Sequence, residues 1–459
     1  MESIQEIFFS LPFLTVISAV IAYIMATRFN LYPVIIYVSK TKGLMDVPEG
    51  RRVHTDQVPN LGGMGLFITF SLTLLLFVPF LNNTVEDLSN ILSLLSATII
   101  LLFLGIKDDL VFITPKKKLV IQLIAVSMVC ILQDIRITDF HGLLGIGELP
   151  YIVSVAFSIF VFVLVINAVN LIDGIDGLAS SIGILASLSF GIAFYMAGNH
   201  MMAIFSAVLI GSLFGFLRYN LSIDRKIFMG DCGSLVVGFL LAYQGICFVN
   251  INPEFVRMYN PNNSAILLLA ILSYPLFDLL RVFTVRIMQK KSPFEADRNH
   301  IHHRLLGLGL NHKQSTLLIF VSNLTLILIT YLTSDLSINI NLIVAVSFGC
   351  LLYLLPFLSV FEEFNENSFI GEVSLSPENN SADRHVETKI ISLNERHKNG
   401  TKINADALKN NTHSSDSEKA LDSRAQKRSE KFRFFMGKKD ESLNEEDKIQ
   451  MDMNELNTK

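Results

Sequence analysis

Apolar runs long enough to cross a lipid bilayer fill most of this sequence. A spanning helix needs about 20 predominantly apolar residues, and few folds other than a membrane bundle can accommodate a series of such runs. We count eleven of them, several short: 6–26, 61–81, 91–106, 119–133, 151–167, 178–197, 201–218, 233–250, 265–287, 315–333 and 338–360. Only 17% of the 459 residues are charged, which is low for a water-soluble protein. The sequence therefore predicts an all-α integral membrane protein, a polytopic bundle of about eleven transmembrane helices, with ten or twelve as alternatives.

The composition changes near residue 362. Residues 363–459 hold 16 of the 37 Lys and Arg, many Asp, Glu, Asn and Ser, and few large apolar residues. We predict a multi-pass membrane domain over 1–362 and a hydrophilic, disordered tail over 363–459. A basic and aromatic piece of the tail, RAQKRSEKFRFFMGKK, could contact anionic lipid. The chain start lacks a basic segment and a small-residue cleavage site, so we expect a retained helix rather than a signal peptide.

Positive charge fixes the expected orientation of the bundle. If the N-terminus lies outside, the inner connections hold 18 Lys and Arg, whereas the outer connections hold two, Arg136 and Arg257. Cytoplasmic loops of membrane proteins are enriched in Lys and Arg. The sequence thus predicts an N-terminus outside and, with eleven spans, a cytoplasmic C-terminus.

Acidic and histidine side chains gather on the predicted cytoplasmic side. They occur in four connections: Asp108 and Asp109 in GIKDDL, Asn170, Asp173 and Asp176 in NLIDGIDG, Asp231 in FMGDCGS, and His300, His302 and His303 in ADRNHIHHRL. Ionisable groups in membrane segments are costly and commonly mark functional sites. Acidic residues of the outer loops are scattered, so we expect one site at the cytoplasmic face.

The stretch NLIDGIDG has a regular polar spacing. Asn170, Asp173 and Asp176 recur every three residues and would share one face of a helix or 3₁₀ turn. Gly174 and Gly177 remove side chains beside them, which leaves room for a bulky ligand or a sharp turn. A plain polar turn between helices is the alternative, but such a turn does not need polar side chains at this regular spacing.

The remaining carboxylates suit a divalent cation. Asp108 and Asp109 end a predicted helix, where acidic residues oppose the helix dipole unless a cation lies near or water solvates them. Asp231 lies in a glycine-flanked turn that opens a helix beside Ser234, an arrangement suited to a metal that bridges to phosphate. Mg²⁺ prefers oxygen ligands and often binds substrate phosphates, so it is the favoured ion.

Histidines and cysteines raise the alternative of zinc. None of the four cysteines has metal-ligand spacing, and nothing near Cys232 would make it a nucleophile. His300 and His302 do not share a helix face. With Arg298 and Arg304 the histidines form a cluster of donors that favours phosphate or pyrophosphate binding. The basic runs 116–118 and 51–52 add positive charge, although topology alone also explains them.

Carboxylates with Mg²⁺, basic loops and an entrance at the membrane together suit phosphoryl transfer between a soluble nucleotide and a lipid phosphate. The rival class is a secondary transporter, which would place polar groups near the bilayer midplane, commonly in matching halves. Here the acids lie at inner helix ends, and no internal repeat is visible. A structural scaffold would not need Asn170, Asp173, Asp176 and Asp231 together.

Several stretches of the chain resemble one family. LFLGIKDDL, NAVNLIDGIDGLA, FMGDCGSLVVGF and SPFEADRNHIHHRLL, with VPNLGG at 58–63, are similar to motifs of the polyprenyl-phosphate N-acetylhexosamine-1-phosphate transferases, glycosyltransferase family 4. The resemblance covers residues 1–360 in order. It implies a membrane enzyme of ten or eleven helices that transfers a sugar-1-phosphate from a UDP-sugar to undecaprenyl phosphate and releases UMP. The implied cofactor is Mg²⁺, with Mn²⁺ as an alternative ion.

The resemblance also implies roles for individual residues. The catalytic positions would be Asp108, Asp109, Asp173, His302 and His303, with Asp108 as the candidate base, and the metal ligands Asn170 and Asp231. Asp176, Asn220 and Phe228 would lie near the uridine, with Phe228 as a stacking platform, and Lys118 and Arg281 would reach phosphate. Arg298, His300 and Arg304 complete the expected substrate-binding set. Arg281 could instead pair with Asp278, three residues earlier.

The histidine pattern HIHH is similar to the branch of the family that uses UDP-N-acetylglucosamine. The implied product, lipid-linked GlcNAc diphosphate, would start the O-antigen of a lipopolysaccharide, a teichoic acid or another surface glycan of the cell wall. Transfer of phospho-N-acetylmuramoyl-pentapeptide, or transfer from another UDP-HexNAc, is the alternative. The expected location is the bacterial cytoplasmic membrane, with membrane lipids as partners, a homodimer as a compatible assembly, and no nucleic acid.

Overall fold

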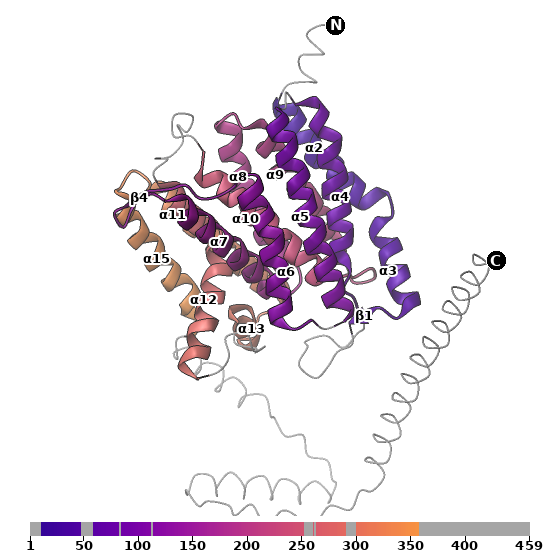
Figure 1. Ribbon diagram of the computed structural model, residues 1–459. Coiled ribbons are helices and arrows are strands. Elements are labelled where there is room, and N and C mark those ends of the chain that lie inside the picture. The colour runs from indigo at the N-terminus through magenta and orange to yellow at the C-terminus, as the bar shows by residue number, and fades with distance from the viewer. Residues whose placement is uncertain are drawn as a thin grey trace, which may run out of the picture. The chain divides into compact units, whose positions relative to one another are not determined.

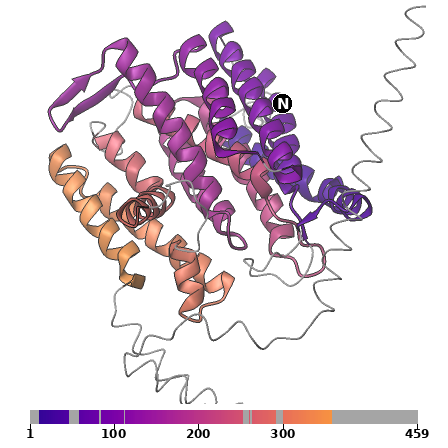
Figure 2. The ribbon, with the colours of Figure 1, turned by 60° about the horizontal axis from the view of Figure 1, so that its bottom comes forward.

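The computed structural model describes residues 11–46, 58–81, 84–111, 113–251, 260, 263–290 and 300–357. All of them belong to the unit Met1–Glu372. Within this unit the helices lie beside one another as a bundle (Figure 1, Figure 2). The described residues thus form the all-α membrane domain that the sequence predicts, whereas the expected tail over 363–459 lies outside them.

Helices account for most of the described residues. The α-helices are α2 (Leu11–Arg28), α3 (Leu31–Lys42), α4 (Gly62–Phe77), α5 (Val85–Leu110), α6 (Pro115–Ser127), α7 (Tyr151–Ile172), α8 (Leu178–Met196), α9 (His200–Asn220), α10 (Gly230–Val249), α11 (Ser264–Ile271), α12 (Ser273–Met288), α13 (Ile301–Gly307), α14 (His312–Leu332) and α15 (Ile338–Leu354). Short 3₁₀ or π segments extend three of them: η1 (Val78–Phe80), η2 (Met128–Leu132) and η5 (Leu355–Phe357). Two antiparallel strand pairs complete the structure: β1 (Met45–Asp46) with β2 (Val58–Pro59), and β3 (Asp139–Leu143) with β4 (Ile146–Glu148).

The number of spanning segments is lower than the sequence predicts. Within the described ranges, nine segments are long and apolar enough to cross a membrane, or ten when the bent pair α11 and α12 counts as one span. The eleventh expected run, 119–133, corresponds to α6 and η2. Helix α6 begins with the sequence PKKK, and three ammonium groups are costly in a bilayer. The polytopic helical bundle is therefore confirmed, whereas the count of about eleven spans and the expected orientation stay predictions.

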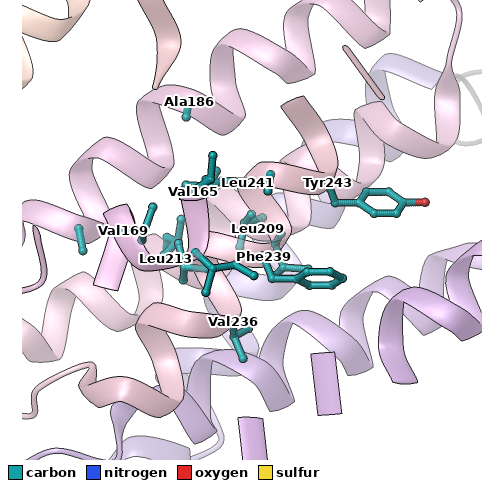
Figure 3. Close-up of a cluster of buried hydrophobic side chains, with 14 of the residues drawn as sticks. Val165, Val169, Ala186, Leu209, Leu213, Val236, Phe239, Leu241 and Tyr243 are labelled. Carbon is teal, nitrogen blue, oxygen red and sulfur yellow. The ribbon is translucent and has the colours of Figure 1, made fainter. Parts of the chain in front are cut away.

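Helix α10 lies inside the bundle. It packs against α4, α5, α7 and α8, and nearly all of its side chains are buried. Figure 3 shows apolar side chains of neighbouring helices, among them Val165 and Leu209, next to side chains of α10 such as Phe239. The rings of Phe162 and Phe239 stack with their centroids 5.5 Å apart. A helix that is surrounded by others has to be apolar all round, so its acidic residue, Asp231, stands in the first turn.

Glycines allow three helices to approach closely at one end of the bundle. A Cβ atom on Gly105 of α5 would lie 2.3 Å from Cα of Cys232, and one on Gly63 of α4 would lie 2.1 Å from the nitrogen of Gly233. Real Cβ atoms do not reach such distances, and the backbone of α10 cannot swing aside as a side chain could. The first turn of α10 therefore rests directly on α4 and α5. We call this the site end; β1 and α13 mark it in Figure 1.

A buried asparagine stabilises the bend between α11 and α12. The two helices meet at 74°, which frees backbone groups near Leu272. Nδ2 of Asn323 in α14 donates to the carbonyl of Ile271 (3.1 Å). Its Oδ1 accepts from the amide of Tyr274 (3.1 Å) and the hydroxyl of Ser273 (2.7 Å). In a bilayer such freed groups need partners within the protein, and at this bend Asn323 provides them.

Replacing Gly105 with Ala should destabilise the bundle. The new methyl group would displace α10 from α5, and overpacking of this kind costs about 1–3 kcal/mol. We expect a lower midpoint of thermal unfolding in detergent, measured by fluorescence-detected size-exclusion chromatography after heating. The matched control is Gly147→Ala in β4, where the nearest atom would lie 3.9 Å from the new carbon. Equal midpoints for the two variants would contradict the packing argument.

Candidate active site

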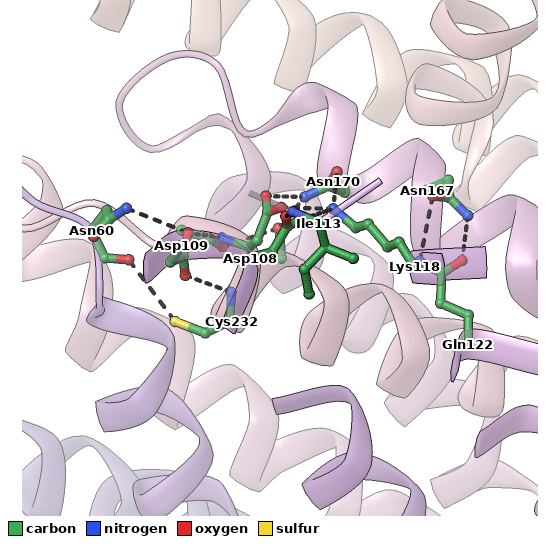
Figure 4. A network of polar contacts seen from close by, with 12 residues as sticks. Asn60, Asp108, Asp109, Ile113, Lys118, Gln122, Asn167, Asn170 and Cys232 are labelled. Carbon is green, nitrogen blue, oxygen red and sulfur yellow. Dashed lines mark hydrogen bonds and ion pairs between the residues drawn. The ribbon is translucent and has the colours of Figure 1, made fainter. Parts of the chain in front are cut away.

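The polar residues expected from the sequence meet at the N-terminus of α10. Asp108 and Asp109 stand at the end of α5, Lys118 near the start of α6, Asn170 in the last turn of α7, and Asp231 in the first turn of α10. Figure 4 shows these segments joined by one network of polar contacts. Residues as far as 123 positions apart in the chain are thus brought together at the site end.

Asp109 caps the first turn of α10. Its Oδ1 accepts the N–H of Asp231 (2.9 Å), and its Oδ2 accepts the N–H of Cys232 (3.0 Å). Asn60 adds a longer contact from Nδ2 (3.4 Å). A carboxylate on the free N–H groups of a helix start satisfies them and complements the helix dipole. Asp109, expected among the catalytic residues, therefore has the contacts of a positioning residue.

Lys118 places one positive charge among the carboxylates. Its Nζ lies 2.6 Å from Asp231 Oδ2, 3.0 Å from Asp108 Oδ2 and 3.5 Å from Asn170 Oδ1. Burial lowers the pKa of the Lys118 ammonium, but the carboxylates of Asp231 and Asp108 outweigh burial and raise the pKa above its usual value. Lys118 is therefore cationic at physiological pH.

Further bonds hold Asp108 and Asn170 in place. Asp108 Oδ1 accepts the N–H of Ile113 (2.9 Å), which closes the turn after α5. Asn170 Nδ2 donates to Asp231 Oδ1 (2.7 Å) and to Ser234 Oγ (2.8 Å). The Asn170 oxygen and the other oxygen of Asp108 and of Asp231 contact the Lys118 ammonium. Oxygen atoms from three helices thus converge on one cationic position.

Asp173 lies beside this cluster as the C-cap of α7. Burial, together with the negative charges of Asp231, Asp109 and Asp176, raises the pKa of its carboxyl well above the usual value. A carboxyl with a raised pKa binds a proton more readily and can exchange it with a ligand. A cation bound nearby would favour loss of the same proton. Asp173 is therefore suited to acid–base chemistry.

Asp176 belongs to a neighbouring group of polar side chains. Its Oδ2 contacts Lys226 Nζ (2.7 Å) and His312 Nδ1 (3.1 Å). Thr316 Oγ1 donates to its backbone carbonyl (3.0 Å). Burial raises the pKa of the Asp176 carboxyl, but the bonds from His312 and Lys226 outweigh it and lower the pKa below the usual value. The loop after α7, the loop before α10 and the start of α14 are thereby joined through one carboxylate.

Asn220 bridges two of these loops. Its buried side chain accepts the N–H of Gly177 at Oδ1 (2.7 Å) and donates from Nδ2 to the carbonyl of Ile227 (2.9 Å). Both ends of the amide are thus bonded to backbone. Asn220, expected near the uridine, holds the Asp173–Gly177 loop against the segment that leads into α10.

Phe228 joins the loop before α10 to the stretch VPNLGG. Its N–H donates to the carbonyl of Pro59 (2.8 Å), and its carbonyl accepts the N–H of Gly62 (3.0 Å). The Nζ of Lys226 lies 5.3 Å from the centre of its ring, within the range of a cation–π contact. The first loop is therefore part of the site, as the resemblance implies, and the Phe228 ring lies next to the Asp176 group.

The three histidines pack ring on ring at α13. The ring centre of His302 lies 5.5 Å from that of His300, nearly parallel at 11°, and 4.4 Å from that of His303. A Cβ on Gly174 would lie only 2.4 Å from His302 Nε2. Burial and the neighbouring His303 lower the pKa of His302 to about 3. His302 therefore faces the Asp173–Gly177 loop as a neutral ring.

The expected arginines have different surroundings. Arg281 Nη2 lies 3.8 Å from Asp278 Oδ1, which is the pairing considered as an alternative from the sequence. Arg304 Nε donates to the carbonyl of Pro356 (3.2 Å), so this side chain reaches the end of α15. Arg298 lies outside the described residues.

The cluster offers oxygen atoms for a hard divalent cation. Within the described part of the chain, no group of three or more His, Cys, Asp and Glu side chains is arranged to hold a metal ion. The amide oxygen of Asn170, however, joins Asp231 and Asp108 around one cationic position. Oxygen donors of this kind suit Mg²⁺ and not zinc. The residues therefore fit a magnesium ion, which would compete with Lys118 for the same oxygens.

Two residues of the Asp176 group were not predicted from the sequence. Lys226 and His312 lie 50 and 136 positions from Asp176 along the chain. A weak signal precedes His312: Asn311 forms a capping box with Gln314, a pattern that marks a helix start. Nothing in the sequence indicates that this helix start faces Asp176.

An amide pair beside Lys118 was also missed. Asn167 Nδ2 donates to Gln122 Oε1 (2.9 Å), one turn along α6 from Lys118 (Figure 4). The signal available was an amide side chain within the apolar run 119–133 and another at the end of the run 151–167. The pair fixes α6 against α7 and thereby the reach of Lys118.

Comparisons with known proteins agree with this arrangement. Residues 91–249 match the family model described as Glycosyl transferase family 4, a stretch that contains the whole cluster around α10. A Bacillus subtilis protein named "Probable undecaprenyl-phosphate N-acetylglucosaminyl 1-phosphate transferase" is 29% identical over 309 residues, which cover 66% of this chain and 82% of the relative.

Proteins of two other bacteria are also similar to this chain. A "Decaprenyl-phosphate N-acetylglucosaminephosphotransferase" of Mycobacterium leprae is 29% identical over 292 residues, 60% of this chain and 73% of the relative. An "Undecaprenyl-phosphate alpha-N-acetylglucosaminyl 1-phosphate transferase" of Escherichia coli K12 is 27% identical over 289 residues, 61% and 74%. In its membrane bundle, in its cluster of acidic residues at the helix ends and in the match of residues 91–249, this chain is similar to members of glycosyl transferase family 4.

Proposed function

We propose that this chain transfers N-acetylglucosamine-1-phosphate from UDP-N-acetylglucosamine to undecaprenyl phosphate, releases UMP, and so starts a lipid-linked surface glycan. One observation carries the proposal: oxygen atoms of Asp108, Asn170 and Asp231 converge with the Lys118 ammonium at one end of a membrane bundle. A soluble donor and a membrane-held acceptor can meet at such an end. We place this end of the bundle at the cytoplasmic face of the bacterial inner membrane. The basic start of α6 lies at the same end, and cytoplasmic segments of membrane proteins are enriched in Lys and Arg.

The names of the relatives support N-acetylglucosamine as the transferred sugar. All three are named for transfer of this sugar phosphate to a polyprenyl phosphate, undecaprenyl in two and decaprenyl in one. At 27–29% identity the donor and the lipid can still differ. Phospho-N-acetylmuramoyl-pentapeptide and another UDP-HexNAc are therefore the alternatives within the same chemistry.

The proposed reaction exchanges one phosphoanhydride bond for another. An oxygen of the lipid phosphate attacks the phosphorus that carries the sugar. The bond from this phosphorus to the oxygen shared with the uridine phosphate breaks, and UMP leaves with that oxygen. Catalysis of such in-line transfers is mainly positioning and stabilisation of negative charge. Since the second pKa of a phosphate monoester is about 6, the acceptor is largely ionised and needs little help from a base.

The side chains of the site suit these tasks. Lys118 can neutralise phosphate oxygens, and an incoming phosphate would draw it away from Asp231 and Asp108. The neutral ring of His302 can hydrogen-bond a phosphate near Gly174 without adding charge. Asp173 can take up the remaining proton of the acceptor, with Asp108 as the second candidate base.

We propose that Asn170 and Asp231 bind Mg²⁺, with Mn²⁺ as an alternative. When bound, the ion would supply positive charge to the diphosphate of the donor and to the departing UMP. Both ligands are already positioned: Ser234 accepts from Asn170 Nδ2, and Asp109 accepts from the Asp231 amide. The excess of carboxylates over ammonium groups in this cluster also favours a cation.

Among the described residues, the broken helix pair α11 and α12 is a feature that a secondary transporter would share. In transporters, half-helices direct free backbone groups at a substrate near the midplane. Here the Asn323 side chain satisfies the carbonyl of Ile271 and the N–H of Tyr274, and the hydroxyls of Ser273 (2.7 Å) and Tyr353 (3.0 Å) donate to the same Asn323 oxygen. We therefore retain the transferase and treat transport as the alternative of a different class.

A transfer assay tests the function directly. Purified protein in detergent, given undecaprenyl phosphate and Mg²⁺, should move label into lipid from radiolabelled UDP-N-acetylglucosamine and not from UDP-N-acetylmuramoyl-pentapeptide. EDTA should abolish transfer, and Mn²⁺ should restore part of it. Label from the pentapeptide donor alone would assign the other branch. No label from any UDP-HexNAc would contradict the proposal, and uptake of UDP-sugar into vesicles would then indicate a transporter.

The metal assignment is tested by Asp231→Asn, which keeps the size of the side chain and removes its charge. Transfer should fall by about 100- to 1000-fold, the loss expected when a charge-stabilising group is removed. The unfolding midpoint should stay close to that of the wild type. The matched control is Asp224→Asn, an exposed residue of the preceding loop. Activity near wild type in Asp231→Asn would exclude Asp231 as a metal ligand.

His302 should make the stability depend on pH. Its pKa is about 3 in the folded protein, against about 6.5 in an unfolded chain. Between these values the unfolded chain binds more protons, so the free energy of unfolding falls as the pH falls, by up to about 1.4 kcal/mol per pH unit. His302→Gln should therefore flatten the decline of the unfolding midpoint between about pH 6.5 and 5.

The control for this measurement is His200→Gln, because His200 is exposed at the start of α9. It should leave the slope of the midpoint against pH unchanged. The same slope in wild type and His302→Gln would mean that His302 is not held neutral by burial.

A further inference from the structure

One carboxylate of the membrane domain is fully buried and lies outside the cluster around α10. Asp278 of α12 has an exposed fraction of 0%, and no other carboxylate among the described residues is as buried. A buried charge needs partners, because loss of hydration is not otherwise compensated. The partners of Asp278 therefore indicate why the chain keeps it.

Both oxygens of Asp278 bind the start of α13. Its Oδ2 lies 2.7 Å from His300 Nδ1, and its Oδ1 accepts the N–H of Ile301 at 2.8 Å. Arg281 is more distant, with Nη2 at 3.8 Å from Oδ1. Because a carboxylate only accepts, His300 Nδ1 is the donor. The two short bonds tie the side chain and the backbone at the beginning of α13 to α12.

A second contact from α12 fixes the next histidine. Tyr274 lies one turn before Asp278, so both side chains project from the same face of α12. The Tyr274 hydroxyl lies 3.4 Å from Nδ1 of His302. This contact orients the other ring nitrogen, Nε2, toward Gly174 in the loop that carries Asp173.

Packing between the histidine rings links the position of His300 to that of His302 and His303. The ring of His300, held by Asp278, is nearly parallel to that of His302 at 5.5 Å, and His303 lies 4.4 Å from His302. A change in the position of His300 would therefore move the ring against which His302 packs.

We propose that Asp278 is a positioning residue of the active site: its ionised carboxylate fixes His300 and the start of α13, and thereby holds His302, against which His303 packs, at the Asp173–Gly177 loop. The group held there would be the diphosphate of the sugar nucleotide, which rests on the proposed function. The docking of α13 on Asp278 does not depend on which ligand binds.

A double-mutant cycle with Asp278→Asn and His300→Gln tests the proposal. If Asp278 acts through His300, each single variant should lower kcat/KM for UDP-N-acetylglucosamine by about 10- to 100-fold, the effect typical of residues that orient a binding group. The double variant should be no worse than the poorer single variant, since both remove one contact. The KM for undecaprenyl phosphate should not change. Losses that multiply, or an equal loss for both substrates, would overturn the proposal.

Hydrogen exchange measured by mass spectrometry supplies a readout that needs no activity. Backbone amides of Ile301–Gly307 should exchange faster in both single variants and in the double variant, with Asp278→Asn at least as fast as His300→Gln, while the amides of α10 stay protected. Unchanged exchange in α13 would also overturn the proposal. The control is Asp335→Asn, an exposed residue after α14, which should match the wild type in every measurement.

These readouts separate the two proposals. If the wild type fails to transfer from UDP-N-acetylglucosamine but Asp278→Asn loosens α13, the proposed function fails and the docking role stands. If Asp278→Asn does not yield folded protein, His300→Gln alone decides the docking role, because it leaves the carboxylate bonded to the Ile301 amide.

Discussion

The contact between the Asp109 carboxylate and the first turn of α10 is the interaction on which the site depends. A helix start inside a membrane domain cannot rely on water for its free N–H groups, and Asp109 accepts two of them, from Asp231 and Cys232. The contact is possible because Gly105, one turn earlier in α5, lets the backbone of Cys232 approach. The close packing of α5 on α10 therefore also determines where the Asp231 side chain lies.

The electrostatic balance of the site follows from that placement. Asp231 and Asp108 share the single ammonium of Lys118, and Asp173 lies close enough to add to the negative charge. The cluster thus carries more potential negative charge than it neutralises, which together with burial keeps the pKa of Asp173 high. A site in this state stabilises added positive charge, whether a metal ion or a proton, and accepts a phosphate only together with such a charge.

A carboxylate that binds the start of a neighbouring helix occurs at two places near the site. Asp109 of α5 holds the beginning of α10, and Asp278 of α12 holds the beginning of α13. In each case a carboxylate from a long helix binds the backbone at the start of another helix, whose first residues face the site. Such contacts are well suited to a membrane protein, because they satisfy buried N–H groups and fix side-chain positions at once.

The sequence alone determined the class of fold and most of the residues of the site. Apolar runs are local features, and ten of the eleven runs correspond to spanning segments when the bent pair α11 and α12 counts as one. The exception is α6, which begins with three lysines, one of which, Lys118, contacts Asp108 and Asp231. The sequence could not assign different roles to Asp108 and Asp109, because the roles depend on their contacts in the folded protein: Asp109 binds the start of α10, and Asp108 contacts Lys118. Nor could it bring Lys226 and His312 to Asp176, because their contact depends on segments up to 136 positions apart. Spacing along the chain encodes which residues share a helix face, whereas the approach of distant helices, set by glycines and buried polar contacts, decides which of those residues meet.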